Sequence, residues 1–464
     1  MPHHPARRGK YPLYLPKGFI QQNPAFLIAA SFALVILTGA VLLTLPVSSR
    51  EGEFTPFLNA LFVATSATCV TGLTVYDTYL HFSLFGQTVI ISLIQVGGLG
   101  LVTMTSFFYS ITRRKVGLRN AQLAQESISA DSRANTMKLL SMVIKVTFVT
   151  ELIGAVLFMP VLIPEFGWYG LYMSVFFAIS SYCNAGFDLF GMLMKDGSLI
   201  PVQHNPYFLT VVMLLIICGG LGFIVWQDLL TWKRKKIFHF HTKVVLVTTA
   251  CLLVGGCVLF LIIEWSNPAT MGNMNFIDKV VNSMFQSVTC RTAGFASFNQ
   301  TEMHDTSKLL STLLMYIGAA PGSTGGGIKN TTALIIFMTV ISVIRGDEDT
   351  TILGRRVSHG TVYRSLAVAV LSGMLLIVVA AVLFKTGAAT TMVDALYESA
   401  SAFGTVGLTC GVTANSGPAA LIAMIVEMYL GRVGPVAFAL SLVMRKRTPA
   451  SRMRLDPEAK IWVA

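Results

Sequence analysis

Charged residues are scarce in this sequence. Only 12% of its 464 residues are Asp, Glu, Lys or Arg, whereas 54% are hydrophobic, and the mean hydropathy is +0.67. This composition excludes an ordinary soluble chain of several domains and predicts an integral membrane protein. The first 24 residues are basic and contain no continuous apolar run, so no cleavable signal peptide is expected. The apolar run near 25–47 would then act as the insertion signal.

Catalytic and metal-binding motifs are also missing. The sequence contains no HExxH or GxSxG motif, and its eight histidines lie mostly near the N-terminus or in loops, which argues against an enzyme. No cysteines form paired CxxC motifs, so neither a disulfide framework nor a zinc site is predicted. The seven cysteines lie within apolar runs or glycine-containing stretches, where most are expected to be small packing residues.

Long apolar runs, by contrast, are abundant, and the positive charges between them are distributed unevenly. Eight runs are long enough to span a bilayer, near 25–47, 83–111, 137–163, 207–232, 243–264, 306–344, 361–384 and 418–444. With eight spans, 25 of the 34 Lys and Arg residues fall on one face, in both terminal segments and three long loops. This bias predicts a multi-pass protein of the cell membrane with both termini in the cytoplasm. The net charge of +12 is therefore interpreted as a topology signal and a contact for anionic membrane lipid, not as a nucleic-acid surface.

A short glycine-containing stretch recurs four times along the chain. The stretches read SATCVTGLT, SSYCNAGFD, VTCRTAGFA and SAFGTVGLT, and their glycines, Gly72, Gly186, Gly294 and Gly407, are separated by 114, 108 and 113 residues. Recurrence at a nearly fixed period indicates a repeat architecture. The sequence therefore predicts an all-α membrane protein in which four tandem helix–pore loop–helix repeats surround one pseudo-fourfold pore, with eight transmembrane helices.

The predicted repeats are separated by cytoplasmic segments. The boundaries are a cytoplasmic N-terminal segment at 1–24, repeat 1 at 25–112, a loop at 113–136, repeat 2 at 137–232, a loop at 233–242, repeat 3 with a broken second helix at 243–345, a loop at 346–360, repeat 4 at 361–445 and a cytoplasmic tail at 446–464.

Each glycine stretch follows a short amphipathic run that cannot cross the membrane. These runs, at 55–68, 168–181, 276–289 and 392–402, are predicted to be pore helices that end near the midplane. The partial negative charge of four helix C-termini aimed at one cavity favours a cation. A glycine after each helix allows the returning backbone to turn its carbonyls inward, where they replace the hydration shell of an alkali cation. One such glycine would be an ordinary turn or packing residue, but four in matching contexts favour an ion filter.

The residues at the four glycines resemble a known filter. Thr405, Val406 and Gly407 match the first three residues of the TVGYG filter of potassium channels, without its tyrosine. One chain with four imperfect filters and eight spans resembles the Trk/Ktr/HKT superfamily of potassium transporters, and it looks most like the KtrB branch. On this resemblance the filter residues are Val70, Thr71, Gly72, Asn184, Ala185, Gly186, Thr292, Ala293, Gly294, Thr405, Val406 and Gly407.

The resemblance implies an activity and partners. Glycine at all four filter positions agrees with the potassium-selective members, so K⁺ is the expected transported ion, with Na⁺ as a possible second ion. KtrB-type subunits resemble homodimers that sit on a cytosolic nucleotide-binding ring of the KtrA type. That ring is a separate polypeptide, and this chain carries no Rossmann-like segment, so no nucleotide is expected on its own motifs. The segments 113–138 and 345–356 and the C-terminal tail are either contacts for the ring or solvated loops.

Four charged residues flank the predicted filter. Asp77 and Asp188 would lie at the outer mouth, where they either concentrate cations or brace the loop. Arg291 lies inside the third stretch, where a cation pore would seem to forbid it. It is therefore expected to point behind the filter and to hold carboxylates or carbonyls, with Glu398 as one possible partner.

A glycine-rich run in the third repeat is the candidate gate. Residues 318–332 combine one proline with five glycines and cannot form a continuous helix, so the run should break at membrane depth and line a cavity or be buried in protein. The family resemblance supports a mobile intramembrane loop beneath the filter. The predicted gate residues in this run are Gly318, Pro321, Gly322, Gly325, Gly326, Gly327 and Lys329.

Two further features bear on this gate. The run nearly matches a phosphate-binding loop, but Ile328 separates its last glycine from Lys329, Asn330 replaces Ser or Thr, and no strand precedes it. Arg432, in the matching glycine cluster of the fourth repeat, is an intramembrane cation. It would repel K⁺ and latch the loop through its carbonyls, or form a structural pair with Glu427 or Glu151.

An ion-coupled secondary transporter is the main alternative. Helices broken at the midplane would suit it equally well. Such proteins usually have inverted repeats, however, whereas the four units of this chain all run in one direction.

Overall fold

The structure is a computed structural model that describes residues 24–100, 133–235 and 238–434. The α-helices are α1 (Pro24–Thr44), α2 (Phe57–Cys69), α3 (Thr78–His81), α4 (Leu84–Leu99), α7 (Arg133–Cys183), α8 (Pro206–Gly220), α9 (Phe223–Lys235), α10 (Phe240–Glu264), α11 (Phe276–Thr289), α12 (Asp305–Tyr316), α13 (Asn330–Arg345), α14 (His359–Lys385), α15 (Met392–Gly404) and α16 (Pro418–Val433). Short 3-10 turns occur at Pro46–Ser48, Phe190–Met192, Ile200–Val202 and Thr413–Asn415. Strands β1 (Thr351–Ile352) and β2 (Arg355–Arg356) form one antiparallel hairpin.

Several helices are apolar enough to cross a membrane. Within the described residues, three helices pass on length and hydropathy, namely the 141–183 part of α7, α10 and α14, and α8 with α9 makes a fourth if that bent pair is one span. The described parts of α1, α4 and α13 are apolar but shorter. Large apolar side chains on these helices face outward: Leu152 is 65% exposed, Ile262 68% and Met374 60%. Such a surface is suited to lipid and not to water.

The helices that precede the four glycine stretches are short and buried. α11 has the bounds expected for the third pore helix, while α2 and α15 each end one or two residues beyond the expected position. The second of these helices is continuous with α7, but Gly167, at φ 59° and ψ −135°, interrupts the helical backbone just before it. Pro160 and Pro164 precede that kink, as expected because proline cannot donate the helical hydrogen bond.

The predicted spans near 207–232 and 306–344 are interrupted within the described residues. The run near 207–232 was expected to cross as one span, but α8 and α9 meet at an angle of 100°. Gly222, at φ 87°, makes this turn, and the amide of the next residue, Phe223, donates to the carbonyl of Gly322 (2.9 Å) instead of continuing α8. The second interruption separates α12 from α13 between Tyr316 and Asn330.

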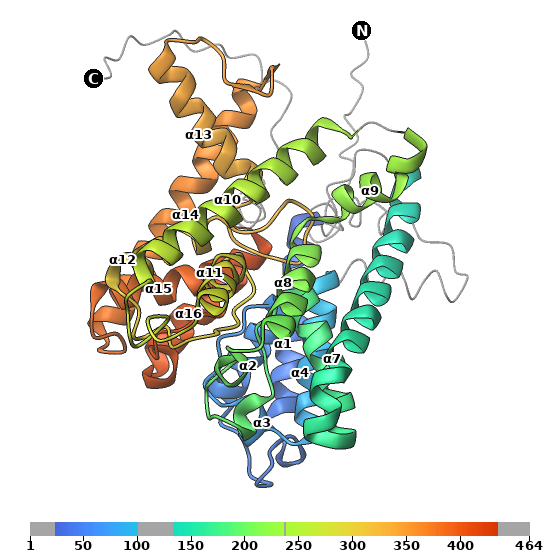
Figure 1. Ribbon diagram of the computed structural model, residues 1–464, viewed down its shortest axis with the longest axis vertical. Coiled ribbons are helices and arrows are strands. Elements are labelled where there is room, and N and C mark those ends of the chain that lie inside the picture. The colour runs from blue at the N-terminus through green and yellow to red at the C-terminus, as the bar shows by residue number, and fades with distance from the viewer. Residues whose placement is uncertain (1–23, 101–132, 236–237, 435–464) are drawn as a thin grey trace, which may run out of the picture.

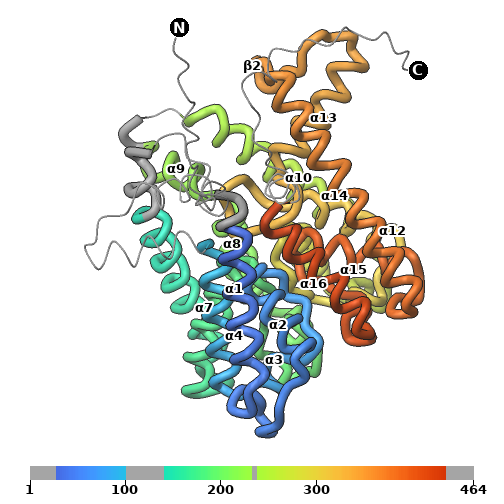
Figure 2. The backbone as a smooth tube through the Cα atoms, turned by 180° about the vertical axis from the view of Figure 1, so that it is seen from behind, coloured from blue at the N-terminus to red at the C-terminus, as the bar shows by residue number. Residues whose placement is uncertain are grey.

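Each short helix packs against the longer helices next to it in the chain. α2 lies between α1 and α4, the end of α7 packs on α8, α11 packs on α10, and α15 packs on α14 and α16 (Figure 1). α16 also contacts α2, so the last unit meets the first (Figure 2). α9 and α13 lie toward one end of the molecule and α3 toward the other (Figure 1). This arrangement brings the four glycine stretches together in the centre.

Candidate cation filter and loop beneath it

Four residues with unusual backbone angles mark the ends of the short helices. Val70, Asn184, Thr292 and Thr405 all have positive φ values, of 60°, 61°, 72° and 49°. Left-handed backbone is uncommon for residues other than glycine and costly for β-branched ones. Its recurrence at the same position in four units shows that the sequence stretches also share a backbone conformation. In each unit the chain then leaves the helix for an extended return.

The four glycines that follow form a closed cycle of contacts. A Cβ atom on Gly72 would lie 2.5 Å from the carbonyl oxygen of Ala185, and one on Gly186 would lie 2.7 Å from that of Ala293. A Cβ atom on Gly294 would lie 2.1 Å from the carbonyl oxygen of Val406, and one on Gly407 would lie 2.2 Å from that of Thr71. Each glycine is therefore packed against the carbonyl of the next unit, and the fourth unit closes on the first.

This cycle concentrates backbone oxygens in a small space. Each of these carbonyls belongs to the residue directly before a filter glycine. These four residues are fully buried: Thr71, Ala185, Ala293 and Val406. A ring of carbonyls can replace the hydration shell of a cation. The short helices add the partial negative charge of their C-termini to the same region. The predicted filter residues are thus brought together in one place.

Hydroxyl groups that the sequence analysis did not single out support the return segment. Ser66 and Ser401 each accept from the amide of the filter glycine six residues later, at 3.0 Å. In the other two units the hydroxyls of Ser180 and Thr289 donate to the carbonyls of Phe187 and Phe295, both at 2.7 Å. The sequence signal was a Ser or Thr five or six residues before each glycine, which is too common a residue type to be noticed alone.

A cavity of about 270 Å³ opens directly above the glycine ring and is lined by all four filter glycines. Asp77 and Asp188 also line it, as predicted for the outer mouth, together with Asp196. Asp77 accepts from the amides of Tyr79, Leu80 and Asp196, so it also braces the loop. Burial and the neighbouring Asp77 carboxylate raise the pKa of Asp188 to about 7. Three carboxylates at the entrance would attract cations whenever they are ionised.

Glu398, considered from the sequence as one possible partner of Arg291, does not pair with it. Glu398 instead accepts from the amides of Cys410 and Thr413 and from the hydroxyls of Thr409 and Thr413, so it organises the chain that follows the fourth filter segment. Its four donors leave no need for a cation. Arg291 is buried, lines a small cavity together with Thr249 and Ala319, and its Nε has no partner among the described residues.

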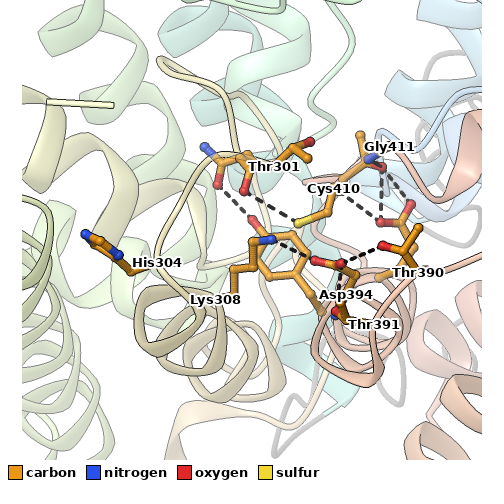
Figure 3. Close-up of polar contacts among 12 residues, drawn as sticks. Thr301, His304, Lys308, Thr390, Thr391, Asp394, Cys410 and Gly411 are labelled. Carbon is orange, nitrogen blue, oxygen red and sulfur yellow. Dashed lines mark hydrogen bonds and ion pairs between the residues drawn. The ribbon is translucent and has the colours of Figure 1, made fainter. Parts of the chain in front are cut away.

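A polar network joins the third and fourth units on the outer side and was also missed from sequence. Lys308 of α12 donates to Asp394 of α15 at 2.8 Å, and both side chains are about nine-tenths buried (Figure 3). Asp394 also accepts from Thr391 at 2.7 Å. Behind them the Tyr397 hydroxyl donates to Gln300, which also bonds to Gln286 at 2.8 Å. The first two charges stand 86 residues apart, so nothing in the sequence relates them.

The segment between α12 and α13 runs directly under the filter. The amide of Gly326 donates to the hydroxyl of Thr405 at 3.0 Å, and a Cβ atom on Gly325 would lie 2.2 Å from the hydroxyl of Thr292. Thr292 and Thr405 are two of the four residues with left-handed backbone at the bottom of the filter. Glycine is therefore required here because the backbone of the loop touches the filter itself.

The same segment is also fastened to the second unit. The amides of Ala320 and Thr324 donate to the carbonyls of Gly220 and Gly219, at 3.1 and 3.3 Å. A parallel bridge between Ile317 and Ile328 closes the base of the segment. We call residues 317–329 the α12–α13 loop. Its broken backbone is paired within the protein, as a non-helical segment at membrane depth must be.

Two basic side chains bind the α12–α13 loop on the side away from the filter. Arg432 of α16 donates to the carbonyl of Thr324 in the loop and to that of Gly97 at the end of α4. It forms no hydrogen bond or ion pair with Glu427, which accepts from Ser399, or with Glu151, which accepts from Gln95, so the structural pair considered from sequence is wrong. Lys329 donates to the carbonyl of Gly325 at 2.8 Å, within the loop.

Comparison with known proteins gives this arrangement a family. A family model described as TrkH, cation transport protein, matches residues 4–451. The chain belongs to the TrkH family of cation transport proteins. The resemblance drawn from the glycine stretches is thereby confirmed, and with its apolar helices the chain is a multi-pass membrane protein.

Individual relatives cover nearly the whole chain. The potassium/sodium uptake protein NtpJ of Enterococcus hirae is 40% identical over 94% of this chain and 96% of its own length. The Ktr system potassium uptake protein B of Bacillus subtilis is 37% identical, over 96% of this chain and 97% of its own. In fold, the chain is similar to the potassium transporter TrkH of Vibrio parahaemolyticus, with a TM-score of 0.68 and 16% identity, covering 96% of this chain and 87% of that one.

Proposed function

We propose that this protein conducts K⁺ into the cell through the ring of backbone carbonyls at its four filter glycines. The observation that carries the proposal is the closed cycle in which each glycine packs against the carbonyl of the next unit. A cation is favoured by the carbonyls, by the four helix C-termini and by the acidic outer mouth, and no fixed positive charge lines that mouth in the described residues. The names of two relatives, a potassium/sodium uptake protein and a potassium uptake protein, support K⁺ as the ion.

The architecture that we propose for this function has four tandem repeats and eight spans with both termini in the cytoplasm. Four short helices, four left-handed residues and four glycines in the same order support the repeats. Of the predicted segments 1–24, 113–136 and 446–464, the structure describes only Pro24, where α1 begins, and residues 133–136, which belong to α7. The predicted loop 233–242 overlaps the end of α9 and the start of α10, and the predicted loop 346–360 lies between α13 and α14 except for its last two residues, which begin α14.

The gate in this proposal is the α12–α13 loop. It crosses directly beneath two filter threonines, and Arg432 binds it to the first and fourth units. Conduction then requires the loop to leave this position. A positive charge held just below the filter would also oppose a K⁺ ion that descends while the loop is in place.

Partners complete the proposal. We propose that the chain forms a homodimer and is regulated by a separate cytosolic nucleotide-binding ring of the KtrA type, and the name of the Ktr-system relative supports a multi-component system. Na⁺ is proposed as a second ion that assists transport, a role supported by the name of the Enterococcus hirae relative, a potassium/sodium uptake protein. Of the segments expected to meet the ring, only 345–356 and residues 133–138 are described: the first follows the end of α13 and includes the β1–β2 hairpin, and the second begins α7.

The decisive experiment is flux of ⁸⁶Rb⁺ into liposomes, comparing the native chain with Gly72→Ser. The added side chain would meet the carbonyl of Ala185, so we expect the K⁺ over Na⁺ preference to fall by at least about tenfold, because filter geometry sets it. Gly52→Ser is the matched control, since Gly52 also has a positive φ but has open space around it. Unchanged selectivity in a folded, active Gly72→Ser protein would contradict the filter and favour a coupled secondary transporter.

A further inference from the structure

A cavity of about 480 Å³ lies between α10 and α13, below the β1–β2 hairpin, and has no part in the filter or its mouth. Its wall is almost entirely apolar, with Val244 and Thr248 from α10, Leu334 and Phe337 from α13, and Ile352 from the hairpin. Its volume falls in the range of about 300–1,000 Å³ that is typical of ligand sites. α10 and α13 lie side by side in both views (Figures 1 and 2).

The rim of this cavity is apolar and exposed. Val247, Phe337 and Leu353 line it and are 53%, 62% and 60% exposed, each from a different wall. Large apolar side chains exposed on helices of a membrane protein face the hydrocarbon of the bilayer. The ligand that can reach this opening is therefore one that is dissolved in the membrane, and its apolar part must be long enough to enter between two helices.

Two cations stand one helical turn from the cavity, toward the end of α10 where its first residues lie. Lys243 is exposed and precedes the lining residue Val247 by four positions, so the two share one face of α10. Arg355 of the hairpin lies over the ring of Phe240, at 5.1 Å, which likewise precedes Val244 by four positions. Neither cation has an ion pair among the described residues, whereas the adjacent Arg356 is paired with Asp349 at 2.8 Å.

We propose that this cavity is a binding site for an anionic phospholipid, with one acyl chain between α10 and α13 and the phosphate near Lys243 and Arg355. Under the proposed topology this end of α10 is cytoplasmic, where anionic lipid headgroups attract juxtamembrane Lys and Arg. The apolar wall accounts for the chain and the two free cations for the headgroup.

Binding of a lipid at this site would act on the α12–α13 loop. Ile317, the first residue of the loop, also lines the cavity, and its bridge to Ile328 closes the base of the loop. A bound acyl chain would contact Ile317 at one end of the loop and would fix the distance from α10 to α13, which begins at the other end of the loop. This consequence rests on the proposed gate, whereas the binding of lipid does not.

The test is photo-crosslinking of the full-length protein in liposomes, with phosphatidylglycerol or phosphatidylethanolamine carrying a diazirine in one acyl chain. We expect cross-linked peptides from 244–252 and 333–338, with a preference for phosphatidylglycerol of about fivefold per cation, equivalent to ~1 kcal/mol each. Lys243→Gln with Arg355→Gln should reduce labelling by phosphatidylglycerol to the level of phosphatidylethanolamine. Because no transport is measured, failure of the proposed function would not affect this result.

Variants that fill the cavity test its location. Ala333→Trp and, independently, Cys251→Phe should abolish the labelling, whereas Val258→Trp on the lipid-facing side of α10 but outside the cavity should leave it unchanged. Labelling that persists in both filled variants would overturn the site, and equal labelling by the two lipids would overturn the headgroup assignment.

Cys251 is the one exposed cysteine of the seven, so efficient joining of two copies by a bifunctional thiol reagent would instead assign the cavity to a second copy of this chain.

Discussion

At the filter, every one of the four glycines faces a backbone oxygen that cannot move aside without moving its own unit. The Cβ contacts that a side chain would make lie between 2.1 and 2.7 Å, well inside van der Waals contact, and all four φ values are positive. Close packing of this kind transmits a displacement in one unit to the next. A single substitution should therefore disturb the whole ring and not only the unit that carries it.

Gly407→Ala tests this where the fourth unit meets the first and closes the ring. Its Cβ would lie 2.2 Å from the carbonyl oxygen of Thr71, at a φ of 103°. We expect ⁸⁶Rb⁺ flux to fall by at least about tenfold, which corresponds to a change of only ~1.4 kcal/mol at the filter. Gly411→Ala is the control, because Gly411 has a φ of 82° and open space, and it should retain flux. Equal loss in both variants would attribute the effect to backbone strain and not to the ring.

The filter positions could be predicted because their chemistry repeats. Four glycines in similar contexts carried the prediction, and the relation of Thr405, Val406 and Gly407 to a known filter gave it an ion. The contacts between units could not be predicted, since Lys308 and Asp394 are far apart in sequence and have no repeated counterpart. The pairing of Arg291 with Glu398 failed because hydroxyl and amide groups, which carry no charge signal, already satisfy the carboxylate.

At the scale of elements, the broken helix of the third unit has more contacts with the other units than with its own. Its loop bonds to α8, to the fourth filter segment and to Arg432 of α16. The Gly- and Pro-rich composition predicted the break, whereas the 100° turn between α8 and α9 was missed, because the apolar run near 207–232 is long enough to be interpreted as one span. The turn exists because Phe223 bonds to the loop, a partner that the sequence does not identify.

Arg432→Gln tests the hold on this loop. The guanidinium bonds carbonyls of the loop and of α4, and hydrogen bonds to charged groups contribute about 1.5–3 kcal/mol each. If the loop is the gate, loss of the Arg432 guanidinium should favour the open arrangement and raise ⁸⁶Rb⁺ flux by about tenfold or more. Arg364→Gln, on the exposed face of α14, should leave flux unchanged. Lower or equal flux in a folded Arg432→Gln protein would contradict the latch.

At the scale of the whole molecule, the distribution of charge and the fold give the same orientation. The hairpin that follows α13 belongs to segment 345–364, which holds four of the arginines counted on the basic face, whereas the cavity above the filter is lined by Asp77, Asp188 and Asp196. Positive charge is retained on the cytoplasmic side of membrane proteins, and a carboxylate-lined entrance suits uptake of a cation from the opposite side. Inward conduction therefore requires that the filter opens outward and the hairpin faces the cytoplasm.

Single cysteines at exposed positions on the two faces test this orientation. Asn299→Cys and Asn415→Cys follow filter segments and should react with a membrane-impermeant maleimide on intact cells, whereas Glu348→Cys should react only after permeabilisation. The native chain gives the background, in which Cys251 faces lipid and is shielded from an aqueous reagent. Because the charge bias acts on the chain as a whole, a reversed pattern at all three positions would invert the topology and turn the proposed entrance into an exit. A reversal at Glu348 alone would instead remove that loop from the surface available to a cytosolic ring while leaving the filter and its direction intact.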